Sequence, residues 1–232
     1  PEEKFVFDSN LRFQTMTDSM LSRSINSLSD YVSNPELEIC MNVWSFFETI
    51  HSNSYTYILQ NVHPDATKFF DSILEDNEIV KRAQFISNRY DALLNTKSND
   101  PKQQIFDALL STQITEGVTF YVSFACSFYF GYRGKMEGNA KIIKLIARDE
   151  NVHLGSTQTL LKLLPQDDPD YIQMYMNKMP IEQTRFAIDN VYLSLNDKSL
   201  DYKKIKYCSG PYRSWITELD NTSMYPNTNP SI

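Results

Sequence analysis

The sequence predicts an all-α protein, and three observations support this fold class. The 232 residues include only six glycines and ten prolines, so little in the chain interrupts long helices. Apolar side chains recur at intervals of three and four, the helical period, as they do at Leu37, Met41, Trp44, Phe47 and Ile50. Alternation of the kind that marks a half-buried strand is nearly absent.

The helices can be assigned in order along the chain. We expect them over about residues 5–20, 34–61, 65–75, 77–95, 101–132 and 136–164. The pair Asn34-Pro35 is typical of an N-cap followed by proline at the first helical position, so it starts the second helix. Gly117 is the only break expected within the fifth helix, and Pro165 is expected to stop the last one.

The chain length and its later part suggest one main domain. A chain of 232 residues builds one well-buried domain, or at most two small ones. Residues 169–195 could hold two further short helices, whereas the polar segment 196–232 is expected to be irregular. We therefore expect a helical bundle over residues 1–195 and an unassigned C-terminal segment over 196–232.

Composition and charge exclude several classes of protein. A net charge of −7 argues against a nucleic-acid-binding surface, because phosphate binding needs concentrated Lys and Arg. The apolar runs are too short to form a transmembrane helix, so no membrane association is expected. Cys40, Cys126 and Cys208 are scattered, which favours reduced thiols in a cytoplasmic protein. The chain starts at Pro1 rather than at an initiator Met, so we expect a fragment or a trimmed chain.

Two of the three histidines lie in the same short pattern. Glu48 and His51 form one Glu-x-x-His motif, and Glu150 and His153 form another, each on a predicted long helix. A spacing of three places both side chains on one helix face, so that a carboxylate and an imidazole can bind one ion. One such motif would be weak evidence for a metal site. Two of them are strong evidence.

Two further carboxylates complete the set that a ferritin-like di-metal bundle needs. In that architecture two helices each supply Glu-x-x-His and two others each supply one carboxylate. Glu116 borders a strongly apolar stretch, where a lone carboxylate must be paired, protonated or bound to a cation. On the first helix the candidates are Asp8 and Asp18, and Asp18 is preferred because it lies among apolar residues in helical register.

The charge of this ligand set suits two metal ions. The four carboxylates carry four negative charges, which two divalent ions balance, as do two trivalent ions with one oxide. Both histidines bind as neutral imidazoles. Oxygen and nitrogen donors without thiolate favour iron or manganese over a structural zinc site.

Tyr55 follows Glu48 by seven residues and His51 by four, so it lies on the same helix face. Phe120, Phe124 and Ile146 are spaced to line an apolar pocket near the metals. A tyrosine held there could lose a proton and an electron and leave a protected radical. The alternative is that Tyr55, one of 14 tyrosines, is simply packed in the core.

Several segments resemble the small subunit of class I ribonucleotide reductases. They are FFETIHSNSYTY at residues 46–57, FYVSFACSF at 120–128, MEGNAKIIKLIARDENVHL at 136–154 and QTMTDS at 14–19, within a similarity that runs over about residues 11–164. The resemblance implies the following roles. The first metal is held by Asp18, Glu48 and His51, and the second by Glu116, Glu150 and His153, with Glu48 and Glu116 as bridges. Tyr55 is the stable radical, Phe120, Phe124 and Ile146 form its apolar pocket, and Asp149 accepts a hydrogen bond from His51 and helps to relay the radical.

The same resemblance implies a function. Such subunits use ferrous iron, dioxygen and an extra electron to form an oxo-bridged diferric centre and a tyrosyl radical, and manganese is a possible substitute. They are homodimers that pass the radical to a large subunit, which reduces ribonucleotides to deoxyribonucleotides. The family's upstream relay tryptophan and its C-terminal docking tail have no counterpart in the sequence. The alternatives are therefore another ferritin-like di-metal oxidase, or a truncated metal-binding fragment without turnover.

Overall fold

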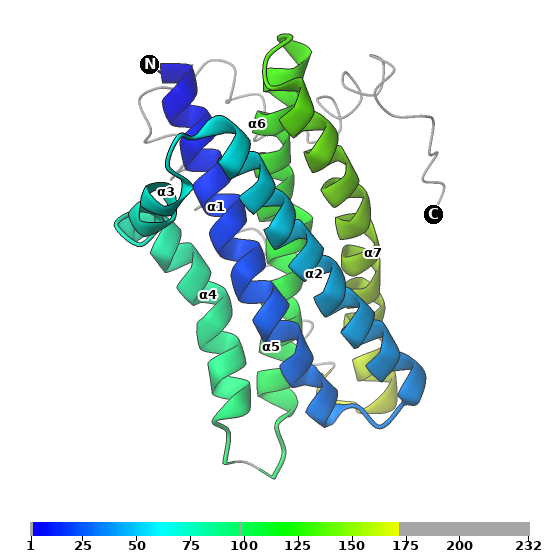
Figure 1. Cartoon of the computed structure of the whole chain (residues 1–232). Coiled ribbons are helices and arrows are strands. Elements are labelled where there is room, and N and C mark those ends of the chain that lie inside the picture. The colour runs from blue at the N-terminus through cyan, green and yellow to red at the C-terminus, as the bar shows by residue number, and fades with distance from the viewer. Residues whose placement is uncertain (1, 98, 172–232) are drawn as a thin grey trace, which may run out of the picture. The chain divides into compact units, whose positions relative to one another are not determined.

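The computed structural model describes residues 2–97 and 99–171, and Figure 1 shows their arrangement. Its elements are α1 (Glu2–Ser24), the 3-10 helix η1 (Ile25–Tyr31), α2 (Pro35–Val62), α3 (Ala66–Ile73), α4 (Asn77–Leu94), α5 (Lys102–Ile114), the π-helix η2 (Thr115–Thr119), α6 (Phe120–Tyr132) and α7 (Glu137–Asp167). The described residues contain no strand, so the all-α prediction is confirmed for them. Residues 172–195 and the segment 196–232, on which further predictions were made, lie outside the described residues.

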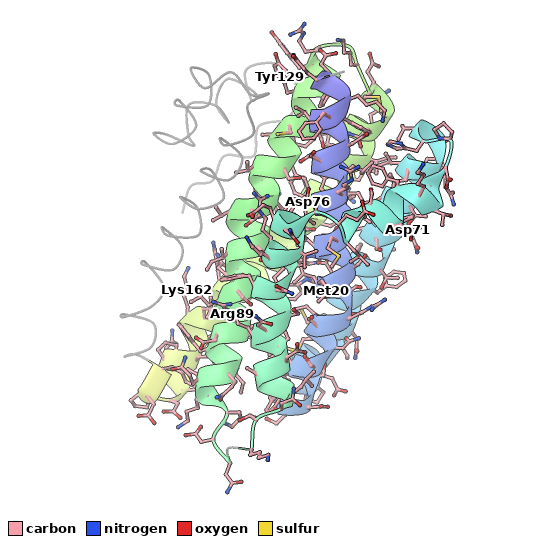
Figure 2. The ribbon with its side chains drawn as sticks, turned by 90° about the vertical axis from the view of Figure 1, so that its left-hand side faces the viewer. Met20, Asp71, Asp76, Arg89, Tyr129 and Lys162 are labelled. Carbon is pink, nitrogen blue, oxygen red and sulfur yellow. The ribbon has the colours of Figure 1, made fainter. Side chains whose placement is uncertain are left out.

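Long helices packed side by side form the bundle. α1 packs mainly against α2, α4 and α6, whereas α7 packs against α6, α5 and, to a smaller extent, α2. In the view turned by 90°, Asp71 marks the short helix α3 at the edge of this group (Figure 2). Within the described part of the chain, no helix combines the length and the apolar character that a membrane-spanning segment needs.

Local sequence signals start the helices where expected. The side chain of Asn34 accepts a hydrogen bond from the Leu37 backbone N–H at 2.9 Å, and Pro35 occupies the first turn of α2, as the sequence predicts. Asp65 caps α3 and Asp76 caps α4 in the same way. Each cap satisfies a backbone donor that the first helical turn leaves unpaired.

The predicted break at Gly117 takes the form of a π-helical turn. The Phe120 backbone N–H donates to the Thr115 carbonyl, five residues earlier, so η2 inserts one extra residue between α5 and α6. A Cβ at position 117 would lie 2.7 Å from Leu154 Cδ1, which shows how closely α7 approaches this turn. The sequence predicted an interruption here but not its kind, because hydrogen-bond register is set by packing against the neighbouring helix.

The prediction that Pro165 stops the last helix is wrong. α7 contains Pro165 and continues to Asp167, and the Asp168 N–H still donates to the Leu164 carbonyl at 3.0 Å. A proline in the last turn removes only its own N–H, so its neighbours can keep helical hydrogen bonds. The first helix is also longer than expected, because it begins at Glu2 and ends at Ser24, where η1 follows.

Candidate metal centre

All six predicted ligands lie together in the centre of the bundle. Four elements supply them, and every one of the six side chains is at most 3% exposed. They are Asp18 on α1, Glu48 and His51 on α2, Glu116 on η2, and Glu150 and His153 on α7. Their donor atoms form two groups that could each hold one ion, and each group combines one imidazole with three carboxylates.

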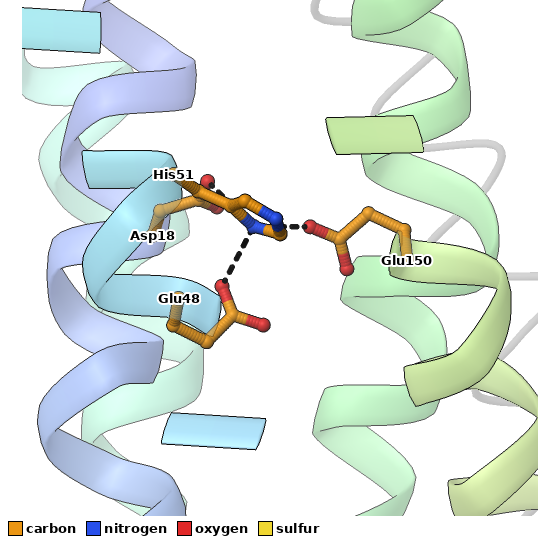
Figure 3. Close-up of side chains that lie close together, drawn as sticks. All are labelled: Asp18, Glu48, His51 and Glu150. Atoms are coloured by element: carbon orange, nitrogen blue, oxygen red, sulfur yellow. Dashed lines mark ion pairs between the residues drawn. The ribbon is translucent and has the colours of Figure 1, made fainter. Parts of the chain in front are cut away.

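The first group surrounds His51. Its Nδ1 lies 3.2 Å from Glu150 Oε1, 3.5 Å from Glu48 Oε2 and 3.8 Å from Asp18 Oδ2 (Figure 3). One turn of α2 brings Glu48 and His51 to the same face, as the spacing of three predicts, whereas Asp18 and Glu150 arrive from two other helices.

The second group surrounds His153. Its Nδ1 lies 2.9 Å from Glu48 Oε1, 3.2 Å from Glu150 Oε2 and 3.9 Å from Glu116 Oε1. Glu48 and Glu150 therefore face both imidazoles, each with one oxygen toward either ring. The resemblance implied Glu48 and Glu116 as bridges. Glu48 fits that role, but Glu116 belongs to one group only and Glu150 takes the second shared position.

The residues present fit a pair of bound cations. Six ligand atoms are buried with no hydrogen-bond partner outside this site among the described residues. They are both carboxylate oxygens of Asp18, Glu48 Oε2, Glu116 Oε2, Glu150 Oε1 and His51 Nδ1. Buried polar atoms are normally paired, so this concentration of unpaired donor atoms at one place indicates a site for ions. The donors are oxygen and nitrogen, which suit iron or manganese.

Burial and crowding shift the protonation of the cluster. Burial, reinforced by the charges of Glu48 and Glu150, raises the pKa of Asp18, and burial with the same two neighbours raises the pKa of Glu116. Burial alone would also raise the pKa of Glu48, but hydrogen bonds from His153 and His51 outweigh it and lower that pKa to about 2. Without metal, the cluster therefore shares protons among its carboxylates.

The two imidazoles hold protons in the same cluster. Burial opposes the charged form of each ring, yet hydrogen bonds and charge from Glu150 and Glu48 outweigh it. They raise the pKa of His51 to about 11 and that of His153 to about 9. Protons therefore occupy positions that cations would take.

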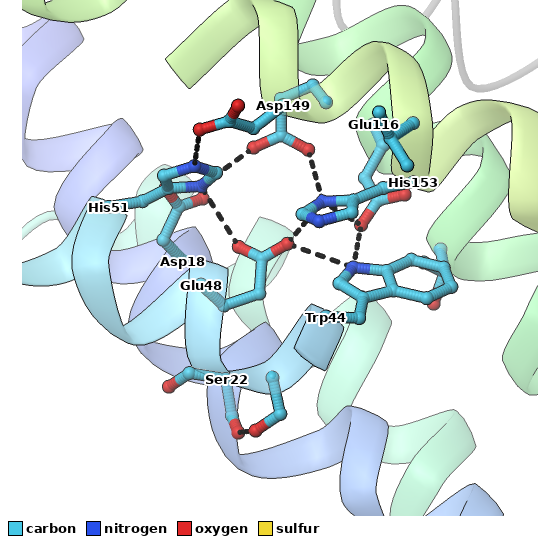
Figure 4. Close-up of polar contacts among 12 residues, drawn as sticks. Asp18, Ser22, Trp44, Glu48, His51, Glu116, Asp149 and His153 are labelled. Carbon is cyan, nitrogen blue, oxygen red and sulfur yellow. Dashed lines mark hydrogen bonds and ion pairs between the residues drawn. The ribbon is translucent and has the colours of Figure 1, made fainter. Parts of the chain in front are cut away.

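Trp44 is a member of the site that the sequence reasoning missed. Its indole Nε1 donates to Glu48 Oε1 at 3.0 Å and to Glu116 Oε1 at 3.2 Å, and its ring stacks on His153 with centroids 4.9 Å apart (Figure 4). In the sequence, Trp44 stands out only as part of the apolar period of its helix. Its position one turn before Glu48 was the available signal, since residues four apart share a helix face.

Asp149 lies behind the first imidazole. Its Oδ2 lies 3.3 Å from His51 Nε2, the nitrogen that points away from the cluster (Figure 4). A carboxylate that accepts the Nε2 proton fixes the tautomer in which Nδ1 carries a lone pair for a metal. This contact is the one that the family resemblance implied.

Tyr55 is fully buried in the described structure. Burial raises the pKa of its hydroxyl, and the negative charge of the neighbouring Asp18 and Glu150 raises that pKa further. Phe120, Phe124 and Ile146 are also buried, and the two phenyl rings stack with centroids 5.6 Å apart. That these three line the tyrosine remains a prediction.

Asp8, the alternative first-helix ligand, is excluded from the cluster. Its Oδ1 lies 2.9 Å from His63 Nε2 and its Oδ2 lies 2.6 Å from Lys4 Nζ. His63 is the C-cap residue of α2 and packs against Phe69. The preference for Asp18 over Asp8 therefore agrees with the geometry.

Comparison with known proteins gives a family match over most of the chain. The family model described as "Ribonucleotide reductase, small chain" matches residues 1–202. The ribonucleoside-diphosphate reductase subunit beta of Haemophilus influenzae is 44% identical over 196 residues, which cover 74% of this chain and 52% of that protein. The chain spans about half the length of the curated relatives that it matches.

Solved structures share the fold. The ribonucleotide reductase R2 subunit from Clostridium botulinum aligns with a TM-score of 0.76 at 26% identity, over 88% of this chain and 66% of that one. Streptococcus sanguinis dimanganese(II)-NrdF aligns with a TM-score of 0.67 at 22% identity, over 90% and 69% of the two chains. These likenesses confirm the predicted ferritin-like helical bundle.

Replacing Trp44 by Phe tests its role in the site. The phenyl ring can still pack on His153, but the donor to Glu48 and Glu116 is lost, so we expect divalent metal affinity to fall about 10- to 100-fold. Titration of the metal-free protein with Mn²⁺, followed by electron paramagnetic resonance, measures this. Phe47→Leu, which alters a second ring near His153 without removing a hydrogen bond, is the matched control and should bind nearly as the native chain does. Native affinity in Trp44→Phe would refute the role.

Metal binding should release protons and strengthen as pH rises. The raised pKa values of His51 and His153 keep both rings protonated near neutral pH, and only the unprotonated nitrogen binds metal. Each group is protonated below its raised pKa, so lower pH favours the proton over the cation. Calorimetric titration in two buffers of different ionisation enthalpy should show about one proton released per imidazole at pH about 7. A release of zero would contradict the protonated cluster.

Proposed function

Because the chain belongs to the family of ribonucleotide reductase small chains, we propose that it generates a tyrosyl radical beside a di-iron centre. A large subunit uses the radical to reduce ribonucleotides to deoxyribonucleotides. The observation that carries this proposal is the pair of carboxylates, Glu48 and Glu150, that face both buried imidazoles. Glu48 and His51 share one face of α2 with Tyr55.

In the proposed centre the ligands divide between two ions. Asp18 and His51 hold the first ion and Glu116 and His153 hold the second, while Glu48 and Glu150 are shared. When bound, the metals would reduce dioxygen and so provide the oxidant for Tyr55. Asp149 keeps His51 in the metal-binding tautomer, and Trp44 orients Glu48 and Glu116 through its indole N–H.

Tyr55 gives up one electron and one proton when the radical forms. Its burial keeps solvent and reductants away, and the raised pKa ensures that the neutral hydroxyl is the starting form. We assign Phe120, Phe124 and Ile146 to the dry pocket around it, since all three are buried. Asp149, 18% exposed, would connect His51 to the outer surface and begin the relay toward the large subunit.

Iron is the proposed metal, with manganese as the alternative. Two divalent ions neutralise the four carboxylates, and the nitrogen and oxygen donors suit both elements. A structural relative, the Streptococcus sanguinis protein, is described as a dimanganese(II) form, which supports the alternative. We place the protein in the cytoplasm, because three scattered cysteines, among them the free thiol of Cys40, favour a reducing compartment.

Metal binding without turnover is the second candidate. It needs only the six clustered residues, which the described part of the chain supplies by itself. Addition of a large subunit of the same family, with a ribonucleoside diphosphate as substrate, separates the two. Deoxyribonucleotide formation supports the first candidate, and its absence in a radical-containing protein supports the second.

Tyr55→Phe should abolish the radical but not metal uptake. Ferrous iron and oxygen are added to the metal-free protein, and optical and electron paramagnetic resonance spectra are recorded. The native chain should show a tyrosyl signal, whereas the variant should take up iron without one. Tyr90→Phe is the matched control, because Tyr90 is also buried but hydrogen-bonds to Thr112. A tyrosyl signal that survives in Tyr55→Phe would assign the radical elsewhere, and ferric bands without a radical in the native chain would favour a non-radical oxidase.

The outer face of α2 supports the proposed homodimer. Between Ile39 and Val62 its only acidic or basic residues are Glu48 and His51, and both are buried. Five large apolar side chains are exposed along this helix at heptad-like spacing, namely Ile39, Val43, Phe46, Ile50 and Tyr57. An apolar face without charges cannot complement a charged partner. Across a two-fold axis, however, it can pack against an identical face. We therefore assign it to a second copy of this chain.

Phe46→Glu tests this face. A charge on a residue that is 62% exposed should leave folding intact but separate the dimer, because a buried unpaired carboxylate is costly. Sedimentation of the native chain should give twice the mass of one chain, and that of the variant a single mass. Leu74→Glu, at an equally exposed leucine on the edge of the bundle, is the control and should stay dimeric. A native chain that sediments as a monomer would refute the assignment.

A further inference from the structure

A line of polar side chains leads along α1 toward the candidate metal centre. Asn10, Gln14 and Asp18 are spaced four residues apart, so they lie above one another on one face of the helix. Their burial increases in that order. Asn10 is partly exposed, Gln14 is 1% exposed and Asp18 is 0% exposed. The line thus runs from the protein surface to a ligand of the first ion.

Two serines of α6 face this line and bond to it. Asn10 Nδ2 donates to Ser127 Oγ at 3.0 Å and to the Ser123 carbonyl at 3.2 Å, while Ser123 Oγ donates to Asn10 Oδ1 at 2.7 Å. Gln14 Nε2 then donates to Ser127 Oγ at 3.5 Å. Ser127 therefore connects Asn10 to Gln14, one helical turn closer to Asp18.

The line ends at two buried polar groups. Gln14 Oε1 makes no hydrogen bond to a described residue, and the Asp18 carboxylate is 0% exposed and lies 3.8 Å from His51 Nδ1. Contacts between α1 and α6 also include two aromatic pairs, Phe7 with Phe130 and Phe13 with Phe120. Polar groups in such an apolar seam are retained at a cost in desolvation, and water molecules commonly occupy buried sites with several unpaired polar atoms.

The proposed reaction needs such a connection. In balanced form, two ferrous ions, one dioxygen, the Tyr55 hydroxyl, one electron and one proton give two ferric ions with one oxide, a tyrosyl radical and one water. A one-electron donor supplies the electron. The proton must enter a site whose ligands are at most 3% exposed, and the water must leave it. Asp149 meets His51 on Nε2, away from the cluster, and so offers no direct contact to Asp18 or Tyr55.

We propose that the polar line Asn10–Ser127–Gln14, completed by water between Gln14 and Asp18, is the path by which protons and water pass between solvent and the metal centre. The role assigned to this path rests on the proposed function. Its existence can be tested in the metal-free protein. There the ring N–H protons of His51 and His153 exchange with water, and any route that carries protons to the cluster sets the rate of that exchange.

The experiment measures this exchange by nuclear magnetic resonance of metal-free protein with ¹⁵N-labelled histidine. Gln14→Leu keeps the side-chain size but removes its polar atoms, and it should slow exchange by about tenfold or more. Ser127→Ala, a smaller change, should slow it in the same direction and serves if Gln14→Leu does not fold. Tyr90→Phe, which removes a buried hydrogen bond between α4 and α5, should have no effect.

Unchanged exchange in both Gln14→Leu and Ser127→Ala would overturn the proposal. Equal slowing in Tyr90→Phe would also overturn it, because it would indicate a general effect on opening of the bundle. Slowing in Asp149→Asn, with native rates in Gln14→Leu, would also overturn it by placing the route behind His51. A second measurement follows radical formation after oxygen is added to the iron-loaded protein, which Gln14→Leu should delay. Absence of any radical in the native chain would refute the proposed function and leave the exchange result standing.

Discussion

Four carboxylates and two imidazoles in a fully buried cluster are the constraint on which the rest of the structure depends. Charges of one sign, removed from water and crowded together, raise the free energy of the folded state unless protons or cations neutralise them. Without metal, protons do so, as the raised pKa values of Asp18 and Glu116 show. The bundle must be stable enough in its apolar layers to hold this cluster, and bound metal would add to that stability.

The helices fix the cluster by a combination of regular and irregular geometry. In α2 and α7 an ordinary helical spacing of three aligns the carboxylate with the imidazole. Glu116 instead lies on a π-helical turn, where one extra residue changes the direction of the side chains relative to α5 and α6. Gly117 lets Leu154 of α7 pack against this turn. The indole N–H of Trp44 on α2 donates hydrogen bonds to both Glu116 and Glu48. A local departure from α-helical bonding is thus held by contacts from two other helices.

A radical site of the proposed kind has two opposing requirements. Tyr55 has to be kept from water, and we assign the buried aromatic residues Phe120 and Phe124 of α6 to that purpose. Protons and water nevertheless have to reach the same centre. The seam between α1 and α6 contains both kinds of contact, since Phe13 meets Phe120 while Asn10 and Gln14 meet the serines of α6. Because aromatic and polar side chains lie at different positions around these helices, one seam can both exclude water from Tyr55 and pass protons and water to the metal centre.

The sequence by itself determined the all-α class, the helix starts at capping residues and the six clustered ligands, because caps and the Glu-x-x-His spacing are local properties of a helix. Only the tertiary structure decided that Glu150 rather than Glu116 faces both imidazoles, that Trp44 bonds two of the carboxylates, and that Gly117 lies in a π-helical turn. Those features depend on the rotation and axial shift of each helix against its neighbours. They arise from side-chain packing between segments distant in sequence, which spacing along one helix does not encode.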